Sequence, residues 1–516
     1  MNLLNSCWPR LRCLCFCFCA GASLASAVAD AAEQFGPPLD TPVAIDAFTR
    51  SGLSTQNIRA QTGLHADLAG SGQDDLLLLQ IQSNKERRLS LYRATAERYS
   101  NEPLVVRDLP ADVIFADIGS WQGRDVLVLF SATQAYQFDP VTGQRQTLVR
   151  FTSIYNNIVD KALPRFNMMR DLNDDGLDDF LVPGFAGFSL FIQQPGGKFT
   201  AAVSMAAPPV MEMSYNEHPW YQARKTYHTD VNADGRDDLT FWVDDEFKAY
   251  LQQDDGFSAE SMVFTPAVVF EAEGYEGISM RMGGEDQSNV LKKALFQFND
   301  LDGDSRPELV TLAVKSEGVL NKQTTYEFYR GQPSKDGVPQ FSATPDSRIE
   351  SKGVQFDMQE KDLNGDGQLD IIVSSVELGL GKLVRALLTG AIRIDLGFYQ
   401  MQNGTYPELP NIVRTIKATF SFSSGDVFVP TVLIADVTGD GLADLLLQEG
   451  DDQLHIYVGE ATDQLFADNP IEVFVAMPRD PDLVQLADLN HDGKQDLILE
   501  IEVKGKPDQI LILIKE

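Results

Sequence analysis

An acidic loop followed by an apolar run recurs along this chain and constrains its fold more than any other feature. The first strong copy reads RDLNDDGLDDFLVPG, from Arg170 to Gly184, and similar copies follow with loops that begin at residues 230, 300, 362, 436 and 488. Counted from the first Asp of each loop, oxygen-bearing side chains occupy positions 1, 3, 5 and 9. A unit that returns at such intervals predicts a repeat architecture.

The spacing of the loop oxygens indicates a calcium site. Oxygen side chains on alternate residues of a tight loop converge on one point, and hard oxygen ligands suit Ca²⁺. Position 7 varies in type, as expected if it offers only its backbone carbonyl, and Gly at position 6 permits the sharp turn. The third copy departs, with Gly303 at position 4 and Ser305 at position 6. The predicted ligands are Asp171, Asn173, Asp175, Leu177 and Asp179; Asp230, Asn232, Asp234, Arg236 and Asp238; Asp300, Asp302, Asp304, Arg306 and Glu308; Asp362, Asn364, Asp366, Gln368 and Asp370; Asp436, Thr438, Asp440, Leu442 and Asp444; Asp488, Asn490, Asp492, Lys494 and Asp496.

These loops are not EF-hands. An EF-hand needs a bidentate Glu at position 12 and a helix on each side. Position 12 is never acidic here, and the residues after each loop are strand-length runs such as LDIIVSS and DLILEI. Acidic β-turns without metal would share the Asp, Asn and Gly content, but turn preference alone does not require an acid at position 9.

Two weaker copies precede the six. One keeps Asp67 and Asp75 and the other keeps Asp117 and Asp125, but neither has a carboxylate or amide at positions 3 and 5. We expect both loops to keep the turn and to lose most metal affinity. Acidic loops therefore start at residues 67, 117, 171, 230, 300, 362, 436 and 488.

Each repeat reads as a strand, an acidic loop, a strand and a hairpin, which together make one four-stranded propeller blade. The predicted fold class is all-β: a single β-propeller of eight blades, or of seven if one weak copy forms no blade. The last copy ends in QILILIKE, before a fourth strand, and TPVAIDAF (41–48) is a spare strand ahead of the first loop. We expect this N-terminal strand to complete the last blade, because closure removes exposed sheet edges.

The loop pattern D-x-[ND]-x-D-G-x-x-D before an apolar strand, found six times, resembles the FG-GAP or VCBS-type repeats of integrin α-chain propellers and their bacterial relatives. The resemblance covers nearly the whole chain after the N-terminal segment. It implies calcium between the first two strands of a blade, at the six ligand sets above. It does not fix a function, since such propellers include adhesion proteins and some eight-bladed polysaccharide lyases.

The N-terminal segment predicts export. Arg10 and Arg12 precede a short apolar run, and small residues follow it, which is typical of a secretory signal peptide rather than a membrane span. We assign residues 1–31 to the signal peptide and 32–516 to the propeller. All five cysteines lie in the signal peptide, so the mature chain would have no disulfide. The periplasm, the cell surface and the medium remain open as destinations.

The net charge of the chain limits the classes of molecule that it can be expected to bind. The formal net charge is −33, which disfavours nucleic acid and anionic membrane, and no apolar run suggests a transmembrane span. We expect a monomer that binds a protein or polysaccharide as a binding or adhesion module at the cell envelope. The alternatives are a polysaccharide-active, lyase-like enzyme and a structural part of an envelope assembly. No catalytic residue stands out, so an enzyme is the less favoured reading.

Three insertions interrupt the repeat. Residues 211–228 hold Trp220 and several tyrosines, suited to stacking on sugar rings or to local packing. Residues 271–293 are rich in Gly and Met. Residues 377–396 place leucines near helical spacing and predict a short amphipathic helix whose apolar side chains pack on the propeller or, alternatively, meet a membrane.

Overall fold

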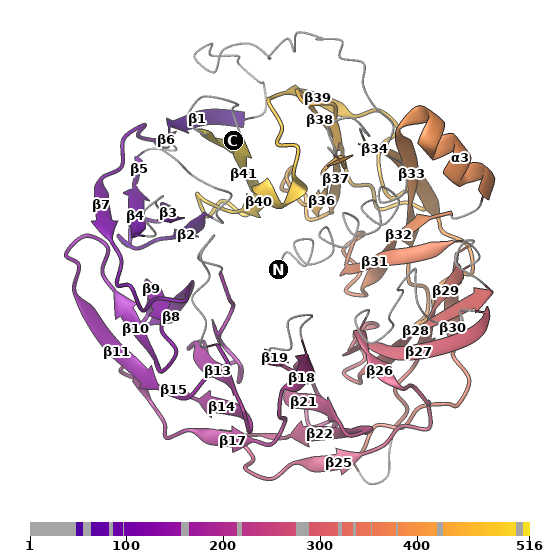
Figure 1. Cartoon of the computed structure of the whole chain (residues 1–516), viewed down its shortest axis with the longest axis horizontal. Helices are drawn as coiled ribbons and strands as arrows, with labels where there is room; N and C mark the ends of the chain where they lie inside the picture. Colours follow the sequence, from indigo (N-terminus) through magenta and orange to yellow (C-terminus); the bar gives the residue numbers. More distant parts are fainter. Residues whose placement is uncertain are drawn as a thin grey trace.

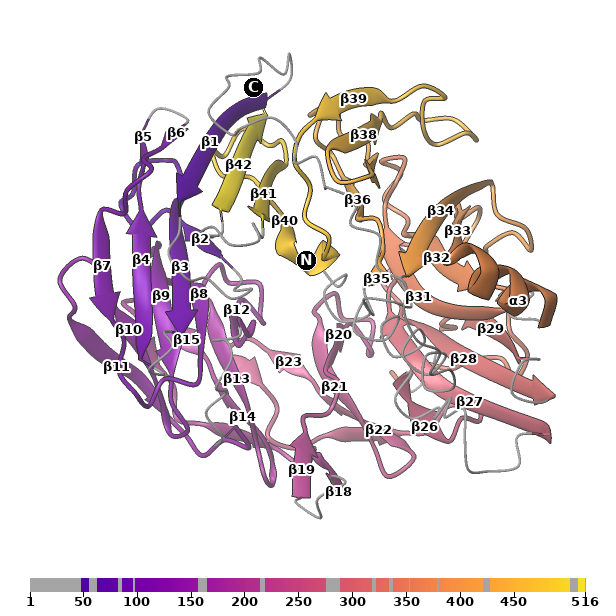
Figure 2. The ribbon, with the colours of Figure 1, turned by 45° about the horizontal axis from the view of Figure 1, so that its top comes forward.

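The protein is a closed ring of β-sheets. The computed structural model describes residues 48–54, 63–81, 86–95, 98–155, 165–213, 219–274, 288–317, 322–333, 337–351, 353–377, 380–420, 427–501 and 509–515. Within these ranges, eight sheets of four or five strands surround one axis (Figures 1 and 2). The predicted all-β propeller is confirmed, and it has eight blades rather than seven.

Sequence order and blade order agree around the ring. In each blade the strands run outward from the axis, and consecutive strands are antiparallel. Blades 1 to 4 are β2 (Leu64–Ala66), β3 (Asp75–Ile81), β4 (Arg87–Tyr92) and β7 (Val105–Asp108); β8 (Phe115–Trp121), β9 (Arg124–Phe130), β10 (Gln134–Phe138) and β11 (Arg145–Arg150); β12 (Met169–Arg170), β13 (Asp179–Gly184), β14 (Gly187–Phe191) and β17 (Val203–Met205); β20 (Tyr227–Thr229), β21 (Asp238–Val243), β22 (Glu246–Tyr250) and β25 (Met262–Phe264).

The second half of the ring has longer strands. Blades 5 to 8 are β27 (Ser288–Asn299), β28 (Glu308–Glu317), β29 (Lys322–Tyr329) and β30 (Ser347–Glu350), with β26 (Ala272–Glu273) parallel to β27; β31 (Val354–Lys361), β32 (Asp370–Val376), β33 (Ala391–Tyr399), β34 (Ile412–Phe420) and β35 (Val427–Phe428); β36 (Val432–Ala435), β37 (Asp444–Glu449), β38 (Gln453–Tyr457) and β39 (Ile471–Phe474); β40 (Val484–Ala487), β41 (Asp496–Ile501), β42 (Gln509–Lys515) and β1 (Phe48–Ser54).

Short accessory elements complete the chain. They are the hairpins β5 (Ala94–Thr95) with β6 (Arg98–Tyr99), β15 (Gln193–Gln194) with β16 (Lys198–Phe199), β18 (Val210–Met213) with β19 (Pro219–Gln222) and β23 (Gln252–Gln253) with β24 (Gly256–Phe257), the helix α3 (Leu380–Thr389) and the 3-10 turn η2 (Pro481–Leu483). No helix among the described residues is long and apolar enough to cross a membrane.

Apolar contacts between neighbouring blades form the core. Eight buried clusters each combine side chains from two consecutive blades, including blade 8 with blade 1. A second strand has a neighbouring blade on both of its faces, so every residue of β21 is buried. That position explains why the runs after the acidic loops are continuously apolar instead of alternating. The outer strand β7 alternates between exposed and half-buried residues, as expected for a strand with one solvated face.

The ring closes through the N-terminal strand, as predicted, but a different segment supplies it. β1 pairs antiparallel with β42, from Phe48 opposite Lys515 to Ser54 opposite Gln509. The predicted segment 41–48 shares only Phe48 with β1, and residues 41–47 lie outside the described part of the chain. Leu53 lies in the apolar cluster between blades 8 and 1, which holds the downstream segment in register.

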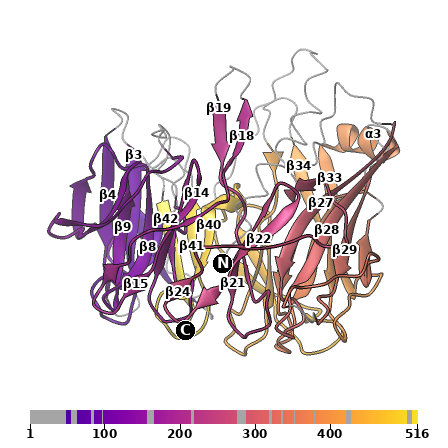
Figure 3. The ribbon, with the colours of Figure 1, turned by 90° about the horizontal axis from the view of Figure 1, so that it is seen from below.

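Two of the insertions project from the same end of the propeller (Figure 3). Val210–Met213 and Pro219–Gln222 pair as the β18–β19 hairpin, and the predicted helix is α3. The expectation that the apolar side chains of the helix pack on the propeller holds for Ala386, which is buried, but not for Val384, Leu387 and Leu388, which are exposed. The insertion at 271–293 is described only at 271–274 and 288–293.

Candidate metal centres

The six strong acidic loops occupy equivalent places in blades 3 to 8. Each connects the first strand of its blade to the second, and position 9 is the first residue of the second strand, as Asp179 is in β13 and Asp370 in β32. Because all first strands run in the same direction, the six loops gather at one end of the ring. This arrangement matches the order of strand, loop and strand expected from the sequence.

The carboxylate at position 1 organises each loop. One oxygen of Asp171 accepts a hydrogen bond from the Gly176 amide at 2.8 Å, and the other accepts one from the Asp175 amide at 3.2 Å. The position 1 carboxylates of the other five loops accept from the position 6 amide in the same way. Position 6 has a positive φ throughout, 81° at Gly176 and 63° at Ser305, so the third copy forms the same turn despite lacking Gly there.

Positions 3 and 5 meet at the outer side of the loop. The amide nitrogen of Asn173 donates to Asp175 at 3.1 Å, and Asn232 and Asn364 make the same bond to Asp234 and Asp366. Asn173 Oδ1 is buried and has no hydrogen-bond partner. An oxygen left open beside two carboxylates is a suitable ligand for a hard cation.

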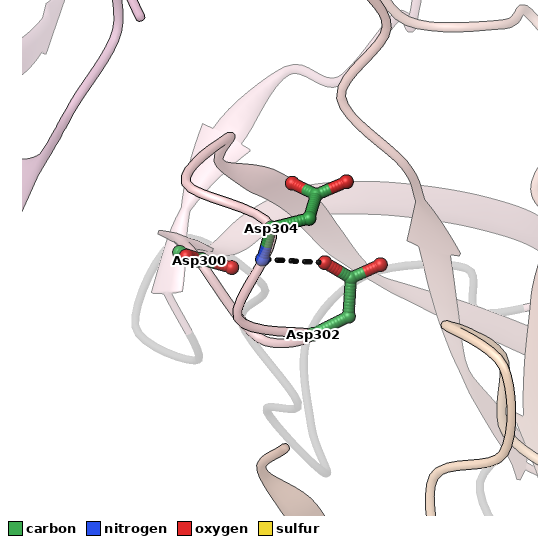
Figure 4. Close-up of side chains that lie close together, drawn as sticks. All are labelled: Asp300, Asp302 and Asp304. Atoms are coloured by element: carbon green, nitrogen blue, oxygen red, sulfur yellow. Dashed lines mark hydrogen bonds between the residues drawn. The ribbon is translucent and has the colours of Figure 1, made fainter. Parts of the chain in front are cut away.

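The loop at residue 300 brings three carboxylates together. Oxygen atoms of Asp300, Asp302 and Asp304 lie within 4.8 Å of one another (Figure 4). Among the described residues, no other three Asp, Glu, His or Cys side chains lie as close together. Two guanidinium groups also reach this loop: Arg306 bonds to Asp304, and Arg330 bonds to Asp302 and lies 3.6 Å from Asp304. The chain therefore supplies part of the countercharge here.

The carboxyl group at position 9 accepts hydrogen bonds from two backbone amides. Asp179 is fully buried, and its oxygens accept from the amide of Leu172 at 3.3 Å and from that of Gln193 at 2.8 Å. It thus joins the loop to the end of the third strand, and each of the other five loops has the corresponding pair of bonds. Glu308 is not a member of the Asp300 group. The role of Glu308 as the fourth ligand of this loop stays a prediction.

Burial raises the pKa of the carboxyl groups at position 9. It raises the pKa of Asp179 to about 7 and that of Glu308 to about 8. The pKa values of Asp238, Asp370 and Asp496 are raised to about 6, and that of Asp444 is raised, by the same loss of hydration. The hydrogen bonds from backbone amides oppose this effect without cancelling it.

Position 7 interacts with the position 5 carboxylate in all six loops, through its backbone amide and in three loops also through its side chain. The amide of Leu177 donates to Asp175, and the equivalent amides of Arg236, Arg306, Gln368, Leu442 and Lys494 donate to position 5 of their own loops. In three loops position 7 is also a cation that pairs with the position 5 carboxylate: Arg236 with Asp234 at 3.1 Å, Lys494 with Asp492 at 3.7 Å, and Arg306 with Asp304. Thr438, at position 3, contacts Asp444 rather than Asp440.

Comparison with protein families gives a match in the last strong repeats. Residues 436–499 match the model of the FG-GAP-like repeat. The matched segment spans two successive acidic loops and the strands between them. The protein is a β-propeller that contains FG-GAP-like repeats. The resemblance drawn from the loop pattern is thereby confirmed, and the match falls on blades 7 and 8 of the ring.

Solved structures resemble this FG-GAP propeller only distantly. A candidate 6-phosphogluconolactonase of Bacteroides fragilis is 11% identical, with a TM-score of 0.31 over 84% of this chain and 98% of its own. A Lactobacillus plantarum protein is 10% identical, with a TM-score of 0.30 over 72% and 99%. The V. cholerae biofilm matrix protein Bap1 is 11% identical, with a TM-score of 0.29 over 90% and 91%. A search of curated protein sequences found no match.

The two weak repeats of the FG-GAP propeller differ from each other. In blade 1, Asp67 accepts from the amides of Ser71 and Gly72 at 2.7 Å, so this copy keeps the turn. In blade 2 there is no loop at residue 117: Asp117 lies inside β8, and Gln122 and Gly123 alone connect β8 to β9. Asp117 accepts from the amides of Met168 and Met169 and so ties blade 2 to blade 3.

Contacts between successive loops link the blades of the FG-GAP propeller at this end. The amide at position 8 of one loop donates to the carbonyl at position 2 of the preceding one: Leu369 to Leu301 at 2.8 Å, Ala443 to Leu363 at 3.3 Å, and Asp74 to Leu489 at 2.8 Å across the ring closure. Asp74 also lies 2.9 Å from His491. The repeat alone could not reveal these links, because each one joins two copies.

Polar contacts on and beside the first strands of blades 4 to 6 were also missed. The ammonium group of Lys225 lies 2.7 Å from the side-chain oxygen of Gln297, and the amide of Gln297 donates to Glu360 at 3.1 Å. Tyr227 donates to Glu273 at 2.9 Å. These residues come from separate repeats and share no local motif, so only the fold places them together.

Proposed function

We propose that this protein is an exported, calcium-binding propeller that serves as an interaction module at the cell envelope. The observation that carries the proposal is the repeated loop in which a position 1 Asp is fixed by backbone amides and oxygen-bearing side chains at positions 3 and 5 lie beside it. Like carboxylates held this close repel one another, and a divalent cation reverses that energy.

The residues present fit calcium. Positions 1, 3 and 5 supply carboxylate or amide oxygens in five loops, Thr438 supplies a hydroxyl in the sixth, and position 7 supplies a carbonyl. The open oxygen of Asn173 and the close group of Asp300, Asp302 and Asp304 support the assignment. Bound Ca²⁺ would neutralise each loop and fix the start of the buried second strand that follows it.

Thermal unfolding with and without Ca²⁺ tests the metal part of the proposal. We expect Ca²⁺ to raise the melting temperature by several degrees and Mg²⁺ to raise it less, because Mg²⁺ gives up its water reluctantly. Asp175→Asn should lower the calcium stoichiometry measured by calorimetry. Asp174→Asn is the matched control, since it removes the same charge from position 4, outside the ligand set. Identical melting curves in Ca²⁺ and in chelator would refute calcium binding.

Export and the role as an interaction module need their own test. The proposed signal peptide, residues 1–31, predicts cleavage near Ala31, which mass spectrometry of the protein from an exporting host would detect. Affinity capture from envelope extracts in Ca²⁺ and in chelator should give partners that depend on the metal. If the chain stays in the cytoplasm uncleaved, the envelope role is wrong even if calcium binds.

A polysaccharide lyase is the second candidate, and the network of Lys225, Tyr227 and Glu273 is the observation that favours it. Burial lowers the pKa of Lys225, and a lysine with a lowered pKa can abstract a proton, whereas Tyr227 lies in the apolar core and donates to Glu273. The test is incubation with acidic polysaccharides while the absorbance of unsaturated products is followed. Activity that is lost in Lys225→Ala but kept in Lys248→Ala, a control on β22, would establish this function; no activity on any acidic polysaccharide would exclude it.

A further inference from the structure

A lysine, a glutamine and a glutamate from three consecutive blades are in contact near the axis of the ring. Lys225 lies just before β20 in blade 4, Gln297 lies in β27 of blade 5, and Glu360 lies in β31 of blade 6 (Figure 2). Nζ of Lys225 is 2.7 Å from Oε1 of Gln297, and Nε2 of Gln297 donates to Oε2 of Glu360 at 3.1 Å. An amine and a primary amide of different blades therefore touch directly.

A β-bulge in β27 places the glutamine in this position. The pairing of β27 with β28 shifts register between Leu295 and Gln297, so Phe296 is the extra residue. Leu295 and Phe298 therefore both lie in the apolar cluster between blades 4 and 5, whereas residues three apart in a regular strand point to opposite faces. The side chain of Gln297 reaches blade 6 instead. The Phe296 carbonyl accepts a second hydrogen bond from Lys225, at 2.7 Å, and so holds Nζ beside the amide.

The surroundings of Lys225 favour its neutral amine. Nζ lies 5.0 Å from the centroid of the Tyr227 ring and 5.7 Å from that of the Phe296 ring. Although part of the side chain is exposed, loss of hydration lowers the pKa of Lys225. A neutral amine can attack a carbonyl carbon. The amide carbon of Gln297 is one bond beyond Oε1 and so lies within about 4 Å of Nζ, close to a near-attack separation of about 3–3.5 Å.

We propose that Lys225 and Gln297 join in an isopeptide bond that ties blade 4 covalently to blade 5. Nζ of Lys225 attacks Cδ of Gln297, a C–N bond forms as the bond from Cδ to Nε2 breaks, and ammonia leaves. One proton of the amine passes to the leaving nitrogen, and Glu360, which is hydrogen-bonded to that nitrogen, stands where it can transfer the proton. The reaction needs no oxidant and no other reagent. The predicted mature chain has no cysteine, so this bond is a covalent tie that replaces a disulfide.

The bond would have two consequences. It would close residues 225–297 into a ring, which stabilises a folded protein chiefly by restricting the unfolded chain. It would also consume the free amine that the lyase candidate requires, so the cross-link and a lyase that depends on Lys225 exclude each other. Calcium is not involved, because the three residues lie outside the predicted ligand sets.

Peptide mass spectrometry tests the proposal on the mature protein, purified in Ca²⁺, denatured and cut with trypsin. We expect residues 225–236 and 294–315 as one joined species, since trypsin does not cleave before Pro307. Its mass should be lower than the sum of the two peptides by about 17 Da, the mass of one ammonia. Fragmentation should place the link at Lys225 and Gln297. Recovery of the two separate peptides without a joined species would overturn the proposal, whatever any variant does.

Variants locate the bond and its consequences. Lys225→Arg keeps a cation but removes the nucleophile, and Gln297→Met removes the amide; both should give separate peptides and a lower melting temperature than the parent protein. Lys248→Arg on β22 and Gln253→Glu on β23 are the matched controls and should keep the joined species. A joined species that persists in Lys225→Arg would refute the assigned site. The peptide map is read on denatured protein, so neither result bears on the calcium proposal.

Discussion

Raising the pH should destabilise the metal-free propeller, and the position 9 carboxyl groups set the size of the effect. Burial raises the pKa of Asp179 to about 7, of Glu308 to about 8, and of Asp238, Asp370 and Asp496 to about 6. A group whose pKa is raised on folding stabilises the fold below its unfolded pKa, near 4 for these acids, and that stability is lost as the pH rises through the folded value. The window is therefore pH 4 to 8.

The magnitude follows from the same values. Each pH unit between the two pKa values is worth about 1.4 kcal/mol for one group, so Asp179 alone should lose about 3 kcal/mol of folding free energy between pH 5 and pH 8. The five groups together should cost several kcal/mol, a large part of the usual stability of a folded protein. Calcium should oppose this loss, because its ligands bind it in the ionised state.

Urea unfolding of protein passed over a chelating resin measures this directly. Trp121 and Trp242 are buried, so their fluorescence reports on the fold. The midpoint should be higher at pH 5 than at pH 8 without metal, and Ca²⁺ should raise it more at pH 8. Asp179→Asn should flatten the pH dependence, since an amide does not ionise, at a fixed cost of about 1–3 kcal/mol for the acceptor it removes. A metal-free midpoint that is unchanged or higher at pH 8 would refute the reasoning.

Three further predictions concern single contacts. Arg330→Met removes a positive charge beside Asp302 and Asp304, so the loop at 300 should bind Ca²⁺ about tenfold more tightly; calorimetry that shows unchanged affinity would contradict this. Leu53→Ala opens a cavity at the ring closure and should cost about 2–5 kcal/mol in urea unfolding, while Gly52→Ala, with open space around its position, should cost much less. Arg93→Ala leaves the buried Asp75 without its ion pair and should cost about 1–3 kcal/mol, more at pH 8 than at pH 5; equal cost at both values would show that the pair is unimportant.

The architecture could be predicted from the repeat because each loop and the strand after it are encoded by neighbouring residues. The alternation of acidic loop and apolar strand favoured eight blades, with seven left open, and predicted the start of the second strands, as Asp179 and Asp370 illustrate. The closing strand was placed one segment too early, since 41–48 and Phe48–Ser54 both carry apolar residues and only pairing with β42 distinguishes them. Asp117 was taken for a loop residue because its copy keeps the spacing, although strand pairing continues through it.

Other features of the site depend on contacts that no local pattern records. That the position 9 acid is a calcium ligand stays a prediction. The structure adds its hydrogen bonds to the loop and to the end of the third strand, and no spacing rule records the place where a distant strand ends. Arg330 and Asp302 come from separate segments of blade 5, so the guanidinium at that loop was not visible in the motif. The leucines of α3 fit a helical stripe, and the stripe did not reveal that Leu388 faces solvent.

The acidic loops act on the ring as well as on their own blades. Since the position 2 carbonyl of one loop accepts an amide of the next, as between Leu301 and Leu369, a cation that fixes one loop also restrains the start of the neighbouring second strand. The chain of contacts passes through Leu489 and Asp74, where the two ends of the propeller sequence meet. Metal at this end would therefore strengthen the ring closure in addition to the pairing of β1 with β42. It would also leave the opposite end, with α3 and the β18–β19 hairpin, as the part of the molecule that the loops do not constrain directly.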